Sequence, residues 1–97
     1  MRPVLMSDVT AMARALMFVE PAAREALGDR IIRKAQAADR FTRRLRRVHP
    51  KWGNGTLRAA AQSEPLARET SFDDPAYCGA VRDVFRALAH ARSHVDM

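Results

Sequence analysis

The stretch Arg30–Lys51, RIIRKAQAADRFTRRLRRVHPK, carries most of the positive charge of this chain. It holds nine of the seventeen Lys and Arg residues and a single acid, Asp39, so its net charge is 9 − 1 = +8. The other 75 residues hold eight bases and ten acids, and the whole-chain charge of +6 is therefore a local feature. A concentrated basic block indicates a polyanionic partner, with nucleic acid first and an anionic membrane surface second. The alternative is a solvated helix face in an arginine-rich composition, because the chain holds fifteen Arg and only two Lys.

The same stretch also has a hydrophobic side. Apolar residues recur every three or four positions, which is the spacing of one face of an α-helix. The candidate core and oligomer contacts on this face are Leu27, Ile31, Ala38, Phe41, Leu45 and Val48. The arginines spread over the opposite arc. The candidate nucleic-acid contacts are Arg33, Lys34, Arg40, Arg43, Arg44, Arg46, Arg47 and Lys51.

The basic block belongs to a long predicted helix over residues 21–48. Pro21 suits its first turn, and His49-Pro50 ends it because the residue before proline disfavours the α region. Gly28 is either an interior glycine or a break in this helix. If the helix is continuous, it is about 42 Å long, whereas a compact chain of this size is roughly 33 Å across. The length therefore predicts that the helix either projects past its own domain or packs along a neighbouring copy, and it favours a homo-oligomer.

The remaining segments are also helical in pattern. Further helices are predicted over residues 8–19, 56–62 and 75–92, with Ser7 or Asp8 as the first cap and Asp74-Pro75 as the last helix start. No segment alternates between apolar and polar residues in the manner of a strand. We therefore predict an all-α fold for residues 1–97, a single small helical domain. It has one long basic amphipathic helix and a C-terminal helix packed antiparallel.

The chain has one cysteine and one tryptophan. Cys78 is expected to be a small buried residue on an apolar stripe with Val81, Phe85 and Leu88, flanked by Tyr77 and Val84. A single cysteine excludes an internal disulfide and fits a reducing compartment. Trp52 either stacks on a base or sugar or closes the end of the core over the long helix, and its large area favours the second role.

Catalytic patterns are missing from the sequence. His90 and His94 have the spacing of a metal pair, but no further ligand accompanies them, and Asp73-Asp74 is better explained as a helix start. No glycine-rich phosphate loop is present. We therefore expect a binding module that is not an enzyme and holds no cofactor or metal. A helix-turn-helix over residues 8–48 is disfavoured, because the second helix is too long and its first turns carry little basic charge.

The location is also predicted from the sequence. The N-terminus lacks the long apolar run of a signal peptide, and no apolar stretch approaches the length of a membrane span. We expect a cytoplasmic protein without a membrane partner.

Three segments carry a family resemblance: the opening MRPVLMSDV, the segment AQAADRFTRRLRRVHPKWGNGTLRAAA, and the later DDPAYCGAVRDVFRALA. Together they resemble short alphaproteobacterial proteins of the gene transfer agent cluster, which serve as the small terminase subunit. The resemblance implies a helical subunit that forms a ring-like homo-oligomer and binds double-stranded DNA weakly, without sequence specificity. It further implies that the subunit presents this DNA to a large terminase subunit for packaging into phage-like particles.

This sequence departs from the general plan of small terminases. It shows no winged helix and no C-terminal β segment, so the resemblance assigns no functional residue. The first interpretation is a small terminase-like DNA-packaging adaptor. The second is a helical protein–protein adaptor or regulator whose arginine face binds an acidic partner. The third is a structural helical subunit without a polyanion site.

Overall fold

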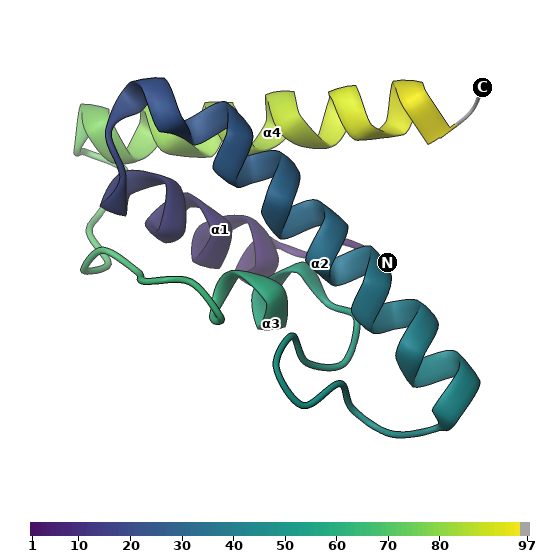
Figure 1. Cartoon of the computed structure of the whole chain (residues 1–97). Helices are drawn as coiled ribbons and strands as arrows, with labels where there is room; N and C mark the ends of the chain where they lie inside the picture. Colours follow the sequence, from purple (N-terminus) through teal and green to yellow (C-terminus); the bar gives the residue numbers. More distant parts are fainter. Residues whose placement is uncertain (96–97) are drawn as a thin grey trace.

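Helices account for all the regular structure of the described residues. The computed structural model describes the backbone of residues 1–95 and the side chains of residues 1–92. The elements are α1 (Met6–Phe18), the 3-10 turn η1 (Pro21–Ala23), α2 (Arg24–Leu45), α3 (Leu57–Ala61) and α4 (Pro75–Val95) (Figure 1). The predicted all-α class is confirmed. Among these described helices, none is both long and apolar enough to cross a membrane.

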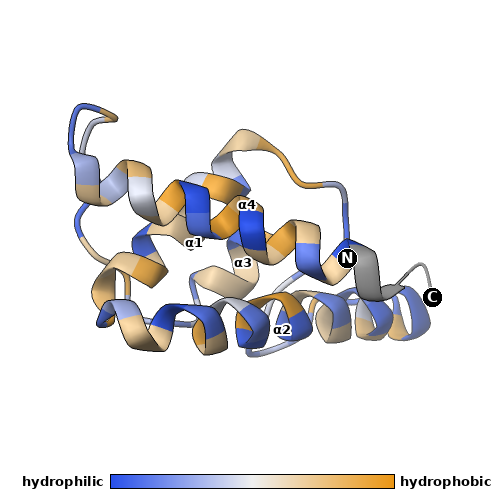
Figure 2. Cartoon of the chain, turned by 90° about the horizontal axis from the view of Figure 1, so that it is seen from above, coloured by the Kyte–Doolittle hydropathy of each residue, from blue (hydrophilic) through white to orange (hydrophobic). Residues whose placement is uncertain are grey.

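The helices are arranged around α1. This helix makes its most extensive contacts with α4, which runs antiparallel to it, and with the short α3 (Figure 1). The long helix α2 crosses this layer obliquely, and its C-terminal end extends past α1 together with the loop that follows. Figure 2 shows hydrophilic and hydrophobic residues interspersed along α2 and α4, as expected of amphipathic helices.

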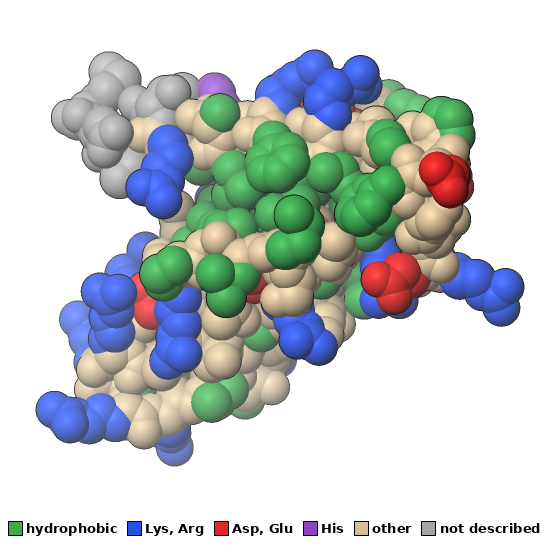
Figure 3. Space-filling view, turned by 180° about the vertical axis from the view of Figure 1, so that it is seen from behind, with side chains coloured by type: hydrophobic (Ala, Val, Ile, Leu, Met, Phe, Trp, Pro, Cys, Tyr) green, Lys and Arg blue, Asp and Glu red, His purple; other side chains and the backbone are tan. Residues whose placement is uncertain are grey.

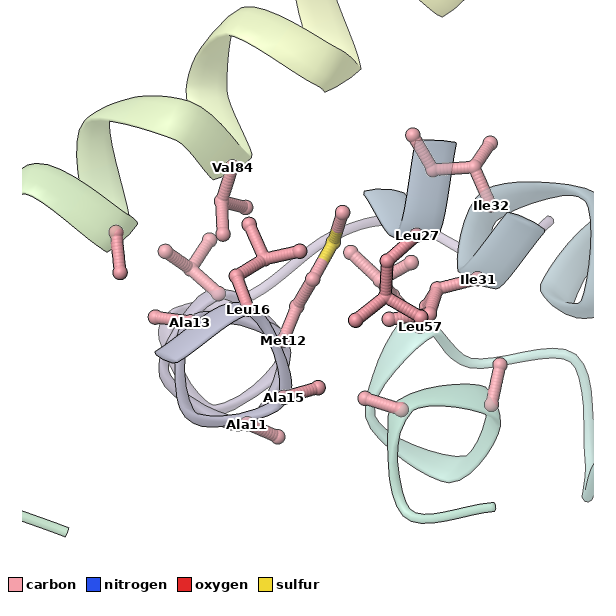
Figure 4. Packing of buried hydrophobic residues seen from close by; sticks show 14 of the residues in the cluster. Ala11, Met12, Ala13, Ala15, Leu16, Leu27, Ile31, Ile32, Leu57 and Val84 are labelled. Atoms are coloured by element: carbon pink, nitrogen blue, oxygen red, sulfur yellow. The ribbon is translucent and has the colours of Figure 1, made fainter. Parts of the chain in front are cut away.

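The core lies between α1 and the three other helices. Side chains from all four helices are buried there, and the largest are Met12, Leu16, Ile31, Leu57, Tyr77 and Val84. Figure 4 shows how Met12, Leu16, Ile31, Leu57 and Val84 pack together. Each fully buried aliphatic side chain of this kind contributes about 1.5–3 kcal/mol. The small residues Ala13, Ala35 and Ala80 are also fully buried and allow the helices to approach closely.

Gly28 does not interrupt α2. The helix is continuous from Arg24 to Leu45, and Gly28 is buried in it. A Cβ at this position would lie 3.4 Å from Cε of Met12 and 3.5 Å from Cβ of Ala87. The glycine therefore lies where α2 packs against side chains of both α1 and α4.

The C-terminal end of α2 differs from the prediction. The helix ends at Leu45 instead of Val48, because Arg46 adopts a left-handed conformation with φ 56° and ψ 37°. Its 22 residues span about 33 Å instead of about 42 Å. This length fits within the longest dimension of the molecule, 41 Å. The prediction of an oligomer therefore needs support other than helix length.

The start of α1 also differs from the prediction. Leu5, and neither Ser7 nor Asp8, is the N-cap residue. Asp8 acts from the third helical position, where one carboxylate oxygen accepts the N–H of Leu5 at 2.8 Å and the other accepts the N–H of Arg58 at 2.8 Å. The side chain is 4% exposed. Asp8 thus satisfies backbone donors at the starts of both α1 and α3.

The buried face of α4 is not the predicted one. Tyr77, Ala80 and Val84 face the core, whereas Cys78 and Phe85 are exposed. The prediction of a buried Cys78 is therefore wrong. The apolar residues of α4 occupy more than one face, and fully buried Ala80 lies on the face that packs inward. The predicted helix start is confirmed, because Asp74 Oδ1 accepts the N–H of Ala76 at 2.9 Å.

Replacing Asp8 with alanine should destabilise the fold by about 3 kcal/mol, because two backbone N–H groups lose a charged acceptor in a largely buried site. Chemical denaturation followed by circular dichroism measures this change. The matched control is Asp73→Ala, which removes an exposed carboxylate and should change the free energy of unfolding by less than about 0.5 kcal/mol. Equal stabilities of the two variants would contradict the bridging role of Asp8.

Candidate nucleic-acid interface

Six basic residues surround the C-terminal end of α2 and the first part of the following loop. We call this set the basic end: Arg40, Arg43, Arg44, Arg46, Arg47 and Lys51, all of which are exposed. Figure 3 shows Lys and Arg side chains crowded around the projecting part of the molecule. The structure thus brings together six of the eight predicted nucleic-acid contacts.

The only acid of the basic block is turned inward. Asp39 is 6% exposed, and its Oδ2 lies 3.2 Å from the guanidinium of Arg43 and 3.4 Å from the amino group of Met1. Gly55 packs directly over it, because a Cβ at Gly55 would lie 2.7 Å from Cα of Asp39. The positive φ of Gly55, 98°, also favours glycine. Burial of this carboxylate leaves the outer surface of the basic end almost entirely cationic.

The loop after α2 folds back and closes on itself. His49 and Gly53 exchange two backbone hydrogen bonds, of 2.9 Å and 3.1 Å. The Nδ1 of His49 accepts the N–H groups of Lys51 at 3.1 Å and Trp52 at 3.0 Å. These bonds hold Lys51 beside the arginines of α2. The loop is thus ordered by its own backbone and by one imidazole.

Three rings tie this loop to α2. Trp52 stacks on His49 with ring centroids 4.7 Å apart, and His49 meets Phe41 of α2 edge-on at 4.8 Å. The guanidinium carbon of Arg47 lies 5.8 Å from the centroid of the Phe41 ring. Trp52 therefore packs on His49 within the loop, and His49 in turn contacts α2. Trp52 lies outside the main buried core, so it does not close the end of that core as expected from its area.

Two bases in the N-terminal part of the basic block pair with an acid from the α3–α4 loop. Glu64 forms a two-bond pair with Arg30, at 3.0 Å and 3.2 Å, and also accepts a hydrogen bond from Lys34. The bond to Arg30 lowers the pKa of Glu64, and Lys34 acts in the same direction against the opposing effect of burial. Lys34, a predicted nucleic-acid contact, is thus engaged within the protein. Arg33 remains exposed on α2, apart from the basic end.

The predicted apolar stripe of α2 divides into two parts. Leu27, Ile31 and Ala38 are buried in the core of the chain itself. Phe41 is half-buried under the aromatic loop, whereas Leu45 and Val48 are 47% and 59% exposed. The first part therefore serves folding, and only the last two residues are available to a partner.

Two basic residues outside the block join its surface. Arg2 and Arg92 line one hollow with Arg43, alongside Pro3 and Leu88 and without an acid. The backbone N–H of Arg2 donates to the carbonyl of Gly55 at 3.0 Å, which holds the N-terminal segment against the loop. The sequence contains no local signal for this grouping, because the three arginines come from segments far apart in the chain.

A second hollow, between the start of α2 and α4, is electrostatically mixed. Its lining residues are Pro21, Arg24, Glu25, Asp29, Asp83, Arg86, Ala87 and His90. Arg24 donates to the carbonyl of Leu16 at 2.9 Å and lies 4.0 Å from Asp83. Acids and bases offset each other here, so this hollow does not attract a polyanion.

The described part of the chain contains no cluster of metal-ligating side chains. Among the described residues, no three His, Cys, Asp or Glu side chains gather closely enough to hold a metal ion. The side chain of His94, one half of the His90–His94 pair, lies outside the described side chains. Asp73 and Asp74 stand at the start of α4, as expected from the sequence.

Comparison with known proteins identifies a family. A family model described as a domain of unknown function, DUF7742, matches residues 2–88. The chain belongs to the DUF7742 family. The matched part of this DUF7742 protein contains the whole basic end and most of α4. No curated protein matches the chain, and no solved structure matches it.

In this DUF7742 domain, Glu64→Gln should lower the free energy of unfolding by about 1 kcal/mol at neutral pH, because the pair with exposed Arg30 is partly screened by solvent. Because the pKa of Glu64 is lowered in the folded state, its contribution is present at neutral pH and is lost as the pH falls below about 4. The difference between wild type and variant should therefore shrink in acid. Urea denaturation at several pH values measures it.

The matched control is Glu69→Gln in the same loop, since Glu69 is exposed. It should unfold like wild type throughout the pH range. A Glu64→Gln defect that stays constant down to about pH 3 would show that the charge of Glu64 is not what stabilises the fold.

Proposed function

We propose that this protein binds double-stranded DNA through the basic end, without sequence specificity, as an adaptor of the small-terminase type. The observation that carries the proposal is the separation of charge in the basic block. Six cations face solvent, while the acid among them, Asp39, is buried. A surface of this kind attracts any polyanion of regular charge spacing, and duplex DNA presents one phosphate charge per roughly 1.7 Å.

The chemistry of the basic end favours phosphates over bases. Five of its six residues are arginines, whose planar guanidinium groups donate to phosphate oxygens in pairs. Contacts to phosphates position a protein on DNA but carry no direct sequence information. The exposed set contains no Asn or Gln suited to reading adenine. The expected binding is therefore similar for unrelated duplexes and falls steeply with salt.

The shape of the molecule is compatible with this mode of binding. The last turns of α2 and their loop extend past α1, so the basic end can approach a duplex without obstruction by the rest of the chain (Figure 1). The opposite end of α2 is packed against the core through Leu27 and Ile31. A helix-turn-helix that uses the first turns of α2 for recognition is disfavoured for that reason.

The packaging role rests on the resemblance to small terminase subunits of gene transfer agents. In that role the protein acts in the cytoplasm as a ring-like homo-oligomer and hands DNA to a large terminase subunit. Weak binding without sequence preference suits the packaging of arbitrary DNA. Repetition of the basic end around an assembly would raise the total affinity by multivalency, without any stronger contact in a single copy.

A second function is favoured by one observation. Leu45 and Val48 are exposed among the arginines, and phosphates offer them no apolar contact. An acidic protein with hydrophobic side chains would cover both kinds of residue, as a helical adaptor or regulator requires. Competition separates the two functions, because DNA displaces such a partner only if both use the basic end.

Replacing Arg40, Arg43, Arg44 and Arg47 together with glutamine should abolish detectable retardation of duplex DNA at physiological salt. At low salt, the slope of log affinity against log salt should decrease in magnitude by about 3 to 4, because up to four phosphate contacts are lost. Electrophoretic mobility shifts with two unrelated duplexes measure both effects.

The matched control replaces four exposed arginines outside the block, Arg58, Arg68, Arg82 and Arg86, with glutamine. It removes the same net charge and should leave most of the binding intact. Circular dichroism should show unchanged helicity for both variants. If both variants lose the same amount of DNA binding, the binding depends on the net charge of the protein and not on the basic end. Absence of binding by the wild type at low salt would reject the function altogether.

A further inference from the structure

A second exposed surface lies on α4, and only its C-terminal end, at Leu88 and Arg92, borders the basic end. Four apolar residues form a continuous stripe there: Cys78, Val81, Phe85 and Leu88. Cys78 is exposed, Phe85 is 53% exposed, and the other two are half-buried against the core. A surface helix normally turns its large apolar residues inward. This stripe instead leaves a phenylalanine in solvent, beside the face that Tyr77, Ala80 and Val84 already bury.

The stripe ends in opposite charges. Asp74 precedes it at the start of α4, and Arg92 follows it near the other end. At about 100° per residue, the five side chains from Cys78 to Arg92 fall within an arc of about 80°. Asp74 is the residue before the helix, where its carboxylate accepts the N–H of Ala76. The arc lies about a quarter turn from the buried face of α4. The helix thus presents a strip that is acidic at its N-terminal end, apolar in the middle and basic at its C-terminal end.

Such a strip is complementary to a reversed copy of itself. The spacing is symmetrical about Asp83: Asp74 mirrors Arg92, Cys78 mirrors Leu88, and Val81 mirrors Phe85. In an antiparallel pair, each residue therefore meets its mirror position on the second helix. Acid meets base at both ends, the apolar residues meet in the middle, and the helix dipoles oppose each other favourably.

We propose that α4 is a homotypic docking surface on which a second copy of this chain packs antiparallel, with Asp74 facing Arg92 of the partner subunit. Figure 3 shows hydrophobic side chains gathered along α4 and continuing onto the neighbouring part of the molecule, where α1 lies. The two-fold axis of such a pair runs across α4 and places both copies of α1 on the same flank. The contact therefore extends beyond the two helices, as a stable dimer requires.

This docking surface is distinct from the oligomer contact expected on α2. Most of the apolar stripe predicted on α2 is buried in the core of the same chain, and Leu45 and Val48 are its exposed residues. The α4 stripe contains none of the six residues of the basic end, although its last two positions, Leu88 and Arg92, line a hollow with Arg43. Cys78 and Phe85 lie outside that hollow. Substitution of Phe85 and substitution of the arginines of the basic end therefore test dimerisation and DNA binding separately.

The antiparallel register is tested by cysteine cross-linking. In the proposed pair, Cys78 faces position 88 of the partner subunit, whereas the two Cys78 residues are about 15 Å apart along the helices. A disulfide needs Cα atoms within about 7 Å. Leu88→Cys should therefore convert most of the protein to a covalent dimer under mild oxidation. The wild type and the Cys78→Ser/Leu88→Cys double variant each have one cysteine and should stay unlinked.

If the wild type or the Cys78→Ser/Leu88→Cys variant cross-links as efficiently as Leu88→Cys, the antiparallel register is wrong. Such a result would indicate parallel pairing or random collision. Failure of Leu88→Cys to cross-link would overturn the register as well. Non-reducing electrophoresis reads all three proteins. Dilution during oxidation separates a pre-formed dimer from collisions, because only the dimer links at a rate independent of concentration.

The apolar contact is tested by a charge in its middle. Wild-type protein should sediment at no less than twice the chain mass of 10.9 kDa at high concentration, and Phe85→Glu should raise the dissociation constant of the α4 contact at least tenfold. The matched control is Val48→Glu, because Val48 is 59% exposed in the loop after α2, outside both α1 and α4. Both variants should keep the wild-type circular dichroism, since neither side chain is in the core. A wild type that is monomeric at all concentrations, or an assembly that Phe85→Glu leaves intact, rejects the proposal.

Discussion

The burial of Asp39 beneath Gly55 is the contact on which the basic end depends. Three segments meet there: α2 supplies the carboxylate, the loop supplies Gly55, and the N-terminal segment supplies the N–H of Arg2, which donates to the carbonyl of Gly55. Any residue with a Cβ at position 55 would collide with the backbone of α2. The loop can therefore close over the acid and hold the bases outside. The positive surface of this protein is a result of packing as much as of composition.

Helical periodicity predicted the order and approximate limits of the helices, because each amphipathic pattern is local to its segment. It could not predict the orientation of α4, where apolar residues cover more than half of the circumference. Which face turns inward depends on how closely another helix can approach, and this favours the side of Ala80 over the side of Phe85. Periodicity also placed the end of α2 too late, since no glycine or proline in the sequence marks the turn at Arg46.

The sequence predicted the basic end because its arginines and lysine lie close together in the sequence, between Arg40 and Lys51. The engagement of Lys34 by Glu64, and the approach of Arg2 and Arg92 to Arg43, depend on tertiary contacts between distant segments. Along α2, Arg30 and Lys34 share the carboxylate of Glu64 and Arg43 pairs with the buried Asp39, whereas the other arginines of the basic end form no ion pair with an acid among the described residues. The basic end and the α4 stripe meet at Leu88 and Arg92, whereas Cys78 and Phe85 lie outside the hollow that Leu88 and Arg92 share with Arg43.

The left-handed conformation of Arg46 has a consequence of its own. Glycine is the residue that ends a helix in this geometry with least strain, and an L side chain there costs about 1 kcal/mol. The chain places a cation at this position instead, between Leu45 and Arg47. The left-handed conformation of Arg46 therefore lowers the stability of the helix end. In return, Arg46 adds a positive charge there and directs its side chain where a residue of a continuing helix could not point.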